Sequence, residues 1–272
     1  MGRSVLFLIA SLLLIVTAHA DALRVICWNI ERGFSPDANP YYVAMRVSQM
    51  PAYDLWGFSE ASQSDFPLLE EACELNSDFD FQRIEGSKSN DRLLVIFNAQ
   101  RLEKLRSLEL TAIEDGEGNQ PFTWQNIRPP LGGKFKDKAS GREFYFFVNH
   151  FHRGNAENRQ RQSRALLRWA QSADAPVIVS GDFNFDWDID LKAGNAAFDI
   201  FTQHNQFDWL EPQQFIKTQT SPRYNSILDF IFMAKAPSVW SATSSILVTP
   251  GDEPDNDIVP DHRPVEGFIH FN

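Results

Sequence analysis

A carboxylate and a carboxamide follow a short apolar run in the sequence VIVSGDFN, residues 177–184. The β-branched residues 177–179 predict a buried strand that ends at Gly181. Asp182 and Asn184 come directly after it, and such a pair can hold a phosphate oxygen, a water molecule or a hard cation. A turn capped by Asp and Asn is the alternative that these residues alone leave open.

Other apolar segments of the chain also end in polar or charged residues. We expect those ends to converge on one pocket, because unrelated strands rarely all finish this way without a shared site. The set contains oxygen ligands and histidines but no cysteine pair, which favours Mg²⁺, with Mn²⁺ or Ca²⁺ as alternatives, over zinc. Its members are Asn29, Glu60, His150, Asp182, Asn184, Asp229, Asp261 and His262.

Hydrophobic periodicity predicts more strands than helices, with strand and helix alternating only in places. This pattern favours one α/β or α+β domain with stacked sheets. We interpret residues 132–141 as a hairpin turn and residues 249–260 as a long surface loop. Strands are predicted at 23–30, 54–60, 93–98, 143–150, 177–181, 226–233 and 264–271, and helices at 41–50, 66–75 and 155–172.

The first 20 residues have the pattern of a secretory signal peptide. Arg3 precedes an apolar run, and Ala18 and Ala20 flank His19 as a cleavage signal. The run is too short to span a bilayer comfortably, and no later stretch resembles a membrane span. We therefore expect a secreted or periplasmic protein whose mature part, residues 21–272, is a single domain and a monomer. Export permits a disulfide between the two cysteines, but two free thiols are equally compatible with the sequence.

The composition is that of a globular protein: 43% of the 272 residues are hydrophobic, and 23 are Phe. The net charge of −11 excludes general electrostatic attraction to polyanions, so a non-specific nucleic-acid coat protein is not expected. An acidic enzyme that brings a cation to a phosphate ester remains compatible with this charge.

Six ordered segments resemble the motif set of the endonuclease/exonuclease/phosphatase family, and they run from Trp28 to Val265. They are WNIERG, GFSEAS, FVNHFHRG, VSGDFN, SILDFIF and PDHRPV. The resemblance implies a four-layer α/β/β/α sandwich with two mixed β-sheets face to face, helices outside, and the active site at one end of the sheets.

The resemblance also implies roles for individual residues. Glu60 matches the principal metal ligand, with Asn29 beside it and Asp261 near the metal. The pair Asp182 and Asn184 matches the residues that position the attacking water and the scissile phosphate. In the same way, Asp229 matches the carboxylate that orients His262, the last histidine. A core Asp–His salt bridge is the structural alternative for that pair.

Two assignments are less specific. His150 fits the family's first histidine better than His152, and Asp91 resembles an acidic partner for it. Arg128 precedes the predicted hairpin, where family members carry an arginine that contacts phosphate; an ordinary surface salt bridge is the alternative. Of the arginines after His150, Arg153 lies nearest the expected pocket mouth.

The substrate class is the least determined feature. Deoxyribonuclease-like members carry basic residues where this chain has Glu31 and Ser62. Our first hypothesis is a metal-dependent phosphodiesterase, most simply a nuclease. Its substrate would be a phosphate ester, and nucleic acid is one candidate. A phosphatase or sphingomyelinase-like enzyme is the second, and a binding module without activity the third. The aromatic residues could stack on bases, contact lipid or form core: Trp187, Phe198, Phe201, Phe207 and Trp209.

Overall fold

The computed structural model describes residues 22–32, 38–75, 77–87, 91–250, 252 and 258–271. Their strands form two six-stranded sheets. The first sheet has the order β11 (Ser241–Ile246), β12 (Val265–His270), β1 (Leu23–Asn29), β2 (Leu55–Ala61), β4 (Arg92–Asn98), β3 (Phe81–Glu85). The second has the order β5 (Leu102–Glu109), β6 (Leu131–Asp137), β7 (Glu143–His150), β8 (Val177–Asp188), β10 (Ser226–Ala234), β9 (Asp208–Trp209).

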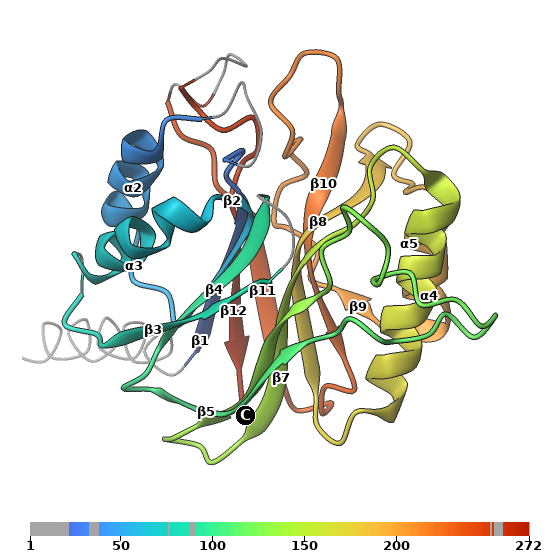
Figure 1. Cartoon of the computed structure of the whole chain (residues 1–272), viewed down its shortest axis with the longest axis horizontal. Helices are drawn as coiled ribbons and strands as arrows, with labels where there is room; N and C mark the ends of the chain where they lie inside the picture. The colour runs from blue at the N-terminus through green and yellow to red at the C-terminus, as the bar shows by residue number, and fades with distance from the viewer. Residues whose placement is uncertain are drawn as a thin grey trace, which may run out of the picture.

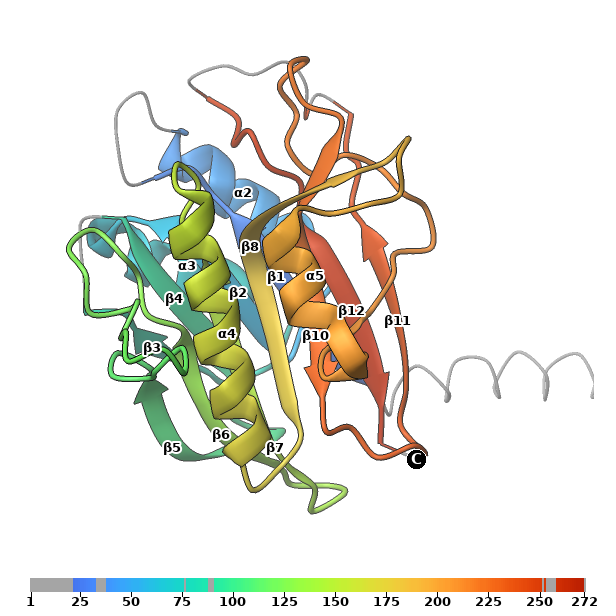
Figure 2. The same cartoon turned by 90° about the vertical axis from the view of Figure 1, so that its right-hand side faces the viewer.

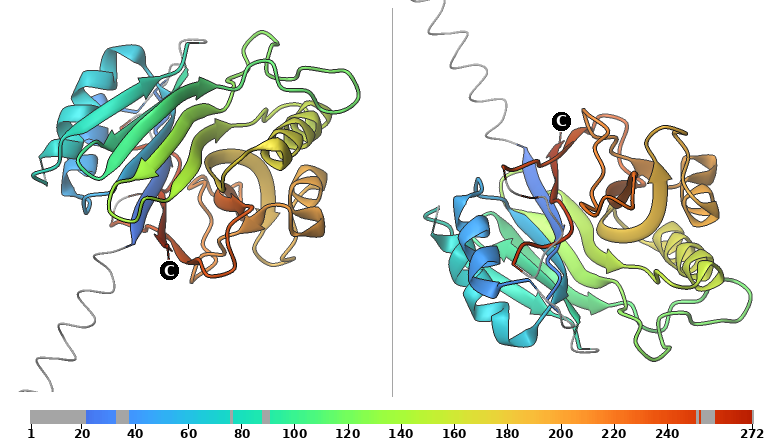
Figure 3. Two further views of the ribbon diagram at one scale, coloured as in Figure 1. Left: turned by 90° about the horizontal axis from the view of Figure 1, so that it is seen from below. Right: turned by 90° about the horizontal axis from the view of Figure 1, so that it is seen from above.

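Among the described residues, four α-helices cover the outer faces of the two sheets (Figure 1). Helices α2 and α3 lie against the first sheet, and α4 and α5 against the second, as the turned views also show (Figures 2 and 3). The result is the α/β/β/α sandwich that the family resemblance implies. The helices are α2 (Pro40–Gln49), α3 (Phe66–Glu74), α4 (Ala156–Ser172) and α5 (Ala196–Thr202), with short 3₁₀ turns at Gln63–Asp65 and Gln203–Asn205.

The central strands are buried on both faces, because a helix layer covers one face and the other sheet covers the second. One hydrophobic cluster fills the space between the sheets and under α4 and α5, and another lies between the first sheet and α2 and α3. All five aromatic residues that could have contacted a substrate belong to or pack against the first cluster; Phe201, for example, is fully buried. They are therefore core residues.

Most predicted elements are found within a few residues of their expected bounds. Strand β7 has the predicted bounds, and Asn155 caps α4 by accepting a hydrogen bond from the backbone N–H of Asn158 at 2.9 Å. The strand predicted to end at Gly181 is an exception, because β8 continues through Asp182 and Asn184 to Asp188.

The predicted hairpin turn at residues 132–141 is wrong over its first half. Gly132 and Gly133 lie inside strand β6. A side chain at Gly132 would collide with the backbone carbonyl of Phe146 on the neighbouring strand β7, so glycine serves close strand approach here and not a turn.

Three further expectations concern export and the cysteines. The signal peptide, residues 1–20, lies outside the described residues. Among the helices that are described, none has the length and apolar character needed to cross a membrane. Cys27 and Cys73 are both buried free thiols, so the disulfide alternative is excluded.

Candidate active site

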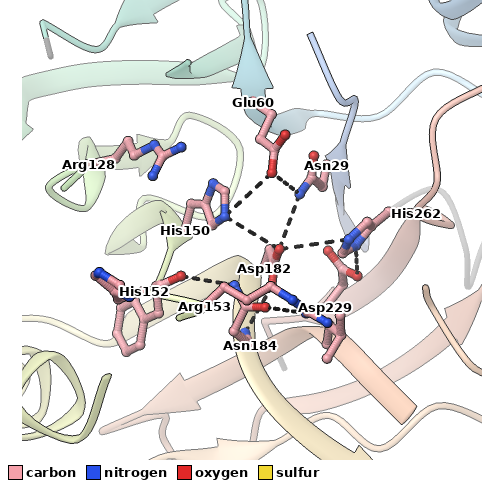
Figure 4. A network of polar contacts seen from close by, with 12 residues as sticks. Asn29, Glu60, Arg128, His150, His152, Arg153, Asp182, Asn184, Asp229 and His262 are labelled. Carbon is pink, nitrogen blue, oxygen red and sulfur yellow. Dashed lines mark hydrogen bonds and ion pairs between the residues drawn. The ribbon is translucent and has the colours of Figure 1, made fainter. Parts of the chain in front are cut away.

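The site lies where two pairs of parallel strands end. Strand β1 runs parallel to β2 with Asn29 beside Ser59, and β7 runs parallel to β8 with His150 beside Asp182. The polar groups that follow these apolar strands therefore gather in one place, between the two sheets' ends (Figure 4).

Irregular strand pairing positions the carboxylates of Glu60 and Asp182. Between β2 and β4 the register shifts after Phe58, and the shift sets Glu60 out of the ladder with a φ of 52°. Between β8 and β10 the pairs Asp182–Asp229 and Trp187–Ile227 leave four residues of β8 opposite one of β10. Such bulges redirect side chains and are frequent beside active sites.

Backbone strain coincides with the site. Glu31, Glu60 and Asn184 have φ values of 49°, 52° and 51°, in the left-handed region that residues other than glycine seldom adopt. Each such residue costs of order 1 kcal/mol or more, and this cost is typically met at functional sites. All three belong to the cluster of polar residues around Asp182.

Asp182 is the centre of this cluster. Its Oδ2 lies 3.6 Å from Nε2 of His150 and 3.9 Å from Nε2 of His262, and it accepts a hydrogen bond from Nδ2 of Asn29 at 3.1 Å. Burial raises the pKa of Asp182 to about 7, although the nearby His262 acts in the opposite direction. The carboxylate thus lies between two imidazoles, and its pKa is near neutral pH.

Glu60 approaches the same point from the first sheet. Its Oε1 accepts a hydrogen bond from Nδ2 of Asn29 at 3.0 Å and lies 3.6 Å from Nε2 of His150. The amide oxygen of Asn29 faces away and accepts the backbone N–H of Glu31 at 3.1 Å. In this arrangement Asn29 orients the two carboxylates through its nitrogen, whereas the sequence predicts it as a metal ligand.

His262 is held by Asp229, as the resemblance implies. Nδ1 of His262 lies 2.7 Å from Oδ2 of Asp229, and both side chains are buried. Burial alone would lower the pKa of His262, but the carboxylates of Asp229, Asp261 and Asp182 together hold it well above its usual range. The hydroxyl of Thr218 accepts the backbone N–H groups of Leu228 and Asp229, which fixes this part of β10.

His150 has the opposite electrostatic environment. Burial and the positive charge of Arg128 keep its pKa well below the usual value, so it is neutral at pH 7. Its Nδ1 is 4.0 Å from Oδ1 of Asp91, beyond hydrogen-bonding distance. His152 lies at the edge of the pocket and uses Nδ1 to accept the backbone N–H of Asn155, so His150 is the histidine that reaches the cluster.

The donor groups around Asp182 fit a divalent cation. One ligand atom each from Glu60, His150 and Asp182 lie within 4.8 Å of one another. In the part of the chain that the structure describes, no arginine or lysine side-chain nitrogen lies within 4.0 Å of the carboxylate oxygens of Glu60 or Asp182. Two adjacent carboxylates without a lysine or arginine partner form the negative, oxygen-rich site that Mg²⁺, Mn²⁺ or Ca²⁺ requires.

Glu31 is a member of the site that the sequence analysis did not predict. Its Oε2 accepts the backbone N–H of Asp261 at 2.9 Å, and both residues line the pocket with Glu60. Burial and then the charge of Asp261 raise the pKa of Glu31 to about 7. The signal was present in the sequence, because Glu31 follows the same predicted strand as Asn29, two residues further along the chain.

Arg128 and Arg153 lie on the pocket lining but differ in their partners. The guanidinium of Arg128 is partly buried and forms an ion pair with the buried Asp91, whereas the alternative in the sequence analysis was a surface salt bridge. Arg153 donates a hydrogen bond from Nη1 to Oδ1 of Asn184 at 2.7 Å. Nδ2 of Asn184 in turn donates to the carbonyl of Phe151 at 2.9 Å.

These residues surround a pocket of about 450 Å³. Glu60, His150, Asp182 and His262 line it together with Glu31, Asp261, Arg128 and Arg153. Asn29, Asn184 and Asp229 hold these residues from behind through the hydrogen bonds described above. The structure thus places every predicted site residue in or directly against one pocket.

No protein-family model and no curated protein matches the sequence. Solved structures do match the fold. An endonuclease/exonuclease/phosphatase family protein from Bacteroides thetaiotaomicron superposes with a TM-score of 0.69, at 16% identity over 92% of this chain and 98% of its own. This chain has the endonuclease/exonuclease/phosphatase fold.

Two further structures with this fold carry specific names. A mannosyl-6-phosphatase of Bacteroides thetaiotaomicron has a TM-score of 0.68, 16% identity and coverage of 92% and 100%. TDP2 of D. rerio, in complex with a single-stranded DNA product, has a TM-score of 0.68, 17% identity and coverage of 92% and 99%. At such identities the similarity defines the fold, and the chemistry of the present chain has to be argued from its own side chains.

Proposed function

We propose that this protein is a divalent-metal-dependent hydrolase of phosphoric esters. The observation that carries the proposal is the position of Asp182, a buried carboxylate between His150 and His262 and beside Glu60, at the base of a pocket. Water attack on an anionic phosphate ester needs charge neutralisation, an activated water and a proton donor. The residues around Asp182 can supply or hold each of these.

Glu60 would be the principal ligand of the cation, which would lower the pKa of bound water and neutralise phosphate charge; Asp182 and His150 lie beside this position. The acidic pair Glu31 and Asp261 adds negative charge beside this position. Asn29 keeps Glu60 and Asp182 in place through its amide nitrogen. These groups define the end of the pocket at which the P–O bond would be cleaved.

The remaining residues move protons. With its pKa raised to about 7, Asp182 can accept a proton from the attacking water at neutral pH. The Asp229 carboxylate keeps His262 protonated and oriented, so that its Nε2–H can donate to a phosphate oxygen or the leaving group. The neutral His150 can accept a hydrogen bond at the opposite side of Asp182.

The charge of the pocket favours small phosphate esters over long nucleic acids. Glu31 and Asp261 line it, Arg128 is neutralised by Asp91, and the net charge of the chain is −11. A polyanion would meet repulsion outside the immediate site. The fold itself accommodates both classes, since one similar protein is named a mannosyl-6-phosphatase and another was solved with a DNA product. A nuclease is therefore the second candidate.

A substrate panel with purified protein and MgCl₂ tests the proposal. It contains a sugar phosphate, bis(4-nitrophenyl) phosphate, single-stranded DNA, plasmid DNA and sphingomyelin. We expect hydrolysis of at least one ester, abolished by EDTA and reduced by about 10³-fold or more in Asp182→Asn, which keeps the shape but removes the base. Equal turnover by wild type and Asp182→Asn would refute the mechanism.

We also propose that the protein is exported, on the basis of the sequence pattern of residues 1–20. Expression of the full chain in a bacterial host, followed by fractionation and mass spectrometry, tests this. A mature N-terminus at Asp21 in the periplasm or medium is the expected result, and full-length protein confined to the cytoplasm would contradict it.

A further inference from the structure

Among the described residues, Arg128 and Arg153 line the pocket and Arg159 bonds to the backbone behind them, and the three differ in their pairing. Arg128 forms an ion pair with Asp91, and Arg159, behind the lining, lies 3.7 Å from Asp186. In the described ranges of the chain, no carboxylate oxygen lies within 4.0 Å of the guanidinium of Arg153. Arg153 is thus the arginine of the pocket whose charge is not neutralised by a neighbouring acid.

Two neighbours nevertheless hold Arg153 in a fixed direction. Its Nη1 donates to Oδ1 of Asn184 at 2.7 Å, and its guanidinium carbon lies 4.7 Å from the centre of the Tyr224 ring. A cation over an aromatic face is stabilised by the ring quadrupole. The guanidinium therefore holds its planar set of N–H donors at the mouth of the pocket, and no ion pair neutralises its charge.

In this arrangement both amide atoms of Asn184 are already bonded within the protein. Its oxygen accepts from Arg153, its nitrogen donates to the carbonyl of Phe151 at 2.9 Å, and its backbone N–H donates to Oδ1 of Asp182 at 2.9 Å. One residue thus links the guanidinium of Arg153 to the carboxylate at the centre of the site (Figure 4). This geometry makes Asn184 a positioning residue.

We propose that Arg153 is the residue that binds the anionic phosphate group of the substrate, and that Asn184 and Tyr224 position it. This inference deepens the proposed function and rests on it for the identity of the anion. With a single uncompensated arginine, the site takes one phosphate group, and the ring of Tyr224, 36% exposed, lies beside the organic part of the ester. The substrate class is then a compact ester with one terminal phosphate.

Binding of inorganic phosphate, measured by titration calorimetry in MgCl₂, tests this without any turnover. We expect Arg153→Gln to weaken phosphate binding by about ten- to a hundredfold, the range for loss of a charge-assisted hydrogen bond. Tyr224→Leu should weaken it by about two- to fivefold, and Tyr224→Phe, which keeps the ring but lacks the hydroxyl, should weaken it less than Tyr224→Leu.

Arg161 is the matched control. It also lies over an aromatic ring, 5.8 Å from the centre of Trp124, but it pairs with Glu157 on the exposed side of α4. Arg161→Gln should bind phosphate as the wild type does. Circular dichroism of each variant confirms that it is folded.

Two results would overturn the inference: phosphate affinity unchanged in folded Arg153→Gln, or no phosphate binding by the wild type. Neither depends on hydrolysis, so the two proposals can fail separately. Phosphate binding through Arg153 in a protein that cleaves no ester would refute the proposed function alone. Hydrolysis with an unchanged KM in Arg153→Gln would refute the role of Arg153 alone.

Discussion

Oδ2 of Asp229 lies 2.7 Å from Nδ1 of His262, and this contact leaves Nε2 of the imidazole directed at Asp182, 3.9 Å away. The two residues come from different parts of the chain, β10 and the segment before β12. Because Nδ1 is bonded to a carboxylate, Nε2 is the atom available to the substrate. The orientation of His262 is thus set from behind the pocket.

Replacing Asp229 tests this orientation. Asp229→Asn preserves shape but removes the negative charge, and we expect kcat to fall by about 10²-fold because the protonated imidazole is no longer stabilised. KM should change little, since Asp229 is buried and does not line the pocket. Steady-state kinetics on the best substrate measures both, and an unchanged kcat would contradict the role.

The same contact predicts a pH dependence of stability. The pKa of His262 is raised in the folded state, so its stabilising effect is complete below the unfolded value near 6.5 and is lost as pH rises through the folded pKa. Thermal unfolding of the metal-free protein should show this loss above pH 6.5. In Asp229→Asn the loss should be smaller, and identical slopes for the two proteins would refute the prediction.

The two histidines of the FVNHFHRG segment should differ in function. We expect His150→Gln to lower kcat by about 10²- to 10⁴-fold, because Nε2 of His150 lies 3.6 Å from both Glu60 and Asp182. His152→Gln is the control, and its kcat should stay within a few-fold of the wild type. A larger loss in His152→Gln than in His150→Gln would reverse the assignment.

Glu60 should determine the affinity for the cation. Glu60→Gln removes one of the carboxylates that face the pocket without a lysine or arginine partner among the described residues. We expect the Mg²⁺ concentration for half-maximal activity to rise by about ten- to a hundredfold. Glu157→Gln, on the exposed side of α4, serves as the control. A Mg²⁺ titration unchanged in Glu60→Gln would exclude the role.

Substitution of Gly132 should destabilise the fold for a reason unrelated to catalysis. An added Cβ would collide with the carbonyl of Phe146 on β7, so Gly132→Ala should lower the free energy of unfolding by about 1–3 kcal/mol. Gly154→Ala, where the nearest atom to the new Cβ would be 3.6 Å away, should change it by less than about 1 kcal/mol. Urea unfolding measures both, and equal midpoints would contradict the packing argument.

Local patterns account for the predictions that agree with the structure. Alternation and β-branched runs predict β7 and the start of β8, and Asn155 predicts the beginning of α4. They do not predict where β8 ends, because its continuation past Gly181 depends on pairing with β10. The role of Gly132 and Gly133 in β6 could not be predicted either, because it depends on close contact with a neighbouring strand.

The sequence by itself determined the types of residue at the site and the order in which they follow their strands. Apolar periodicity predicted one domain with stacked sheets, and the resemblance of six ordered motifs implied the four-layer sandwich. Only the tertiary structure decided which charges are free: Arg128 is paired with Asp91, Arg153 has no acidic partner in the described chain, and Glu31 faces the pocket. The physical reason is that pairing and burial depend on distances between side chains far apart in sequence, and a local pattern contains no such distance.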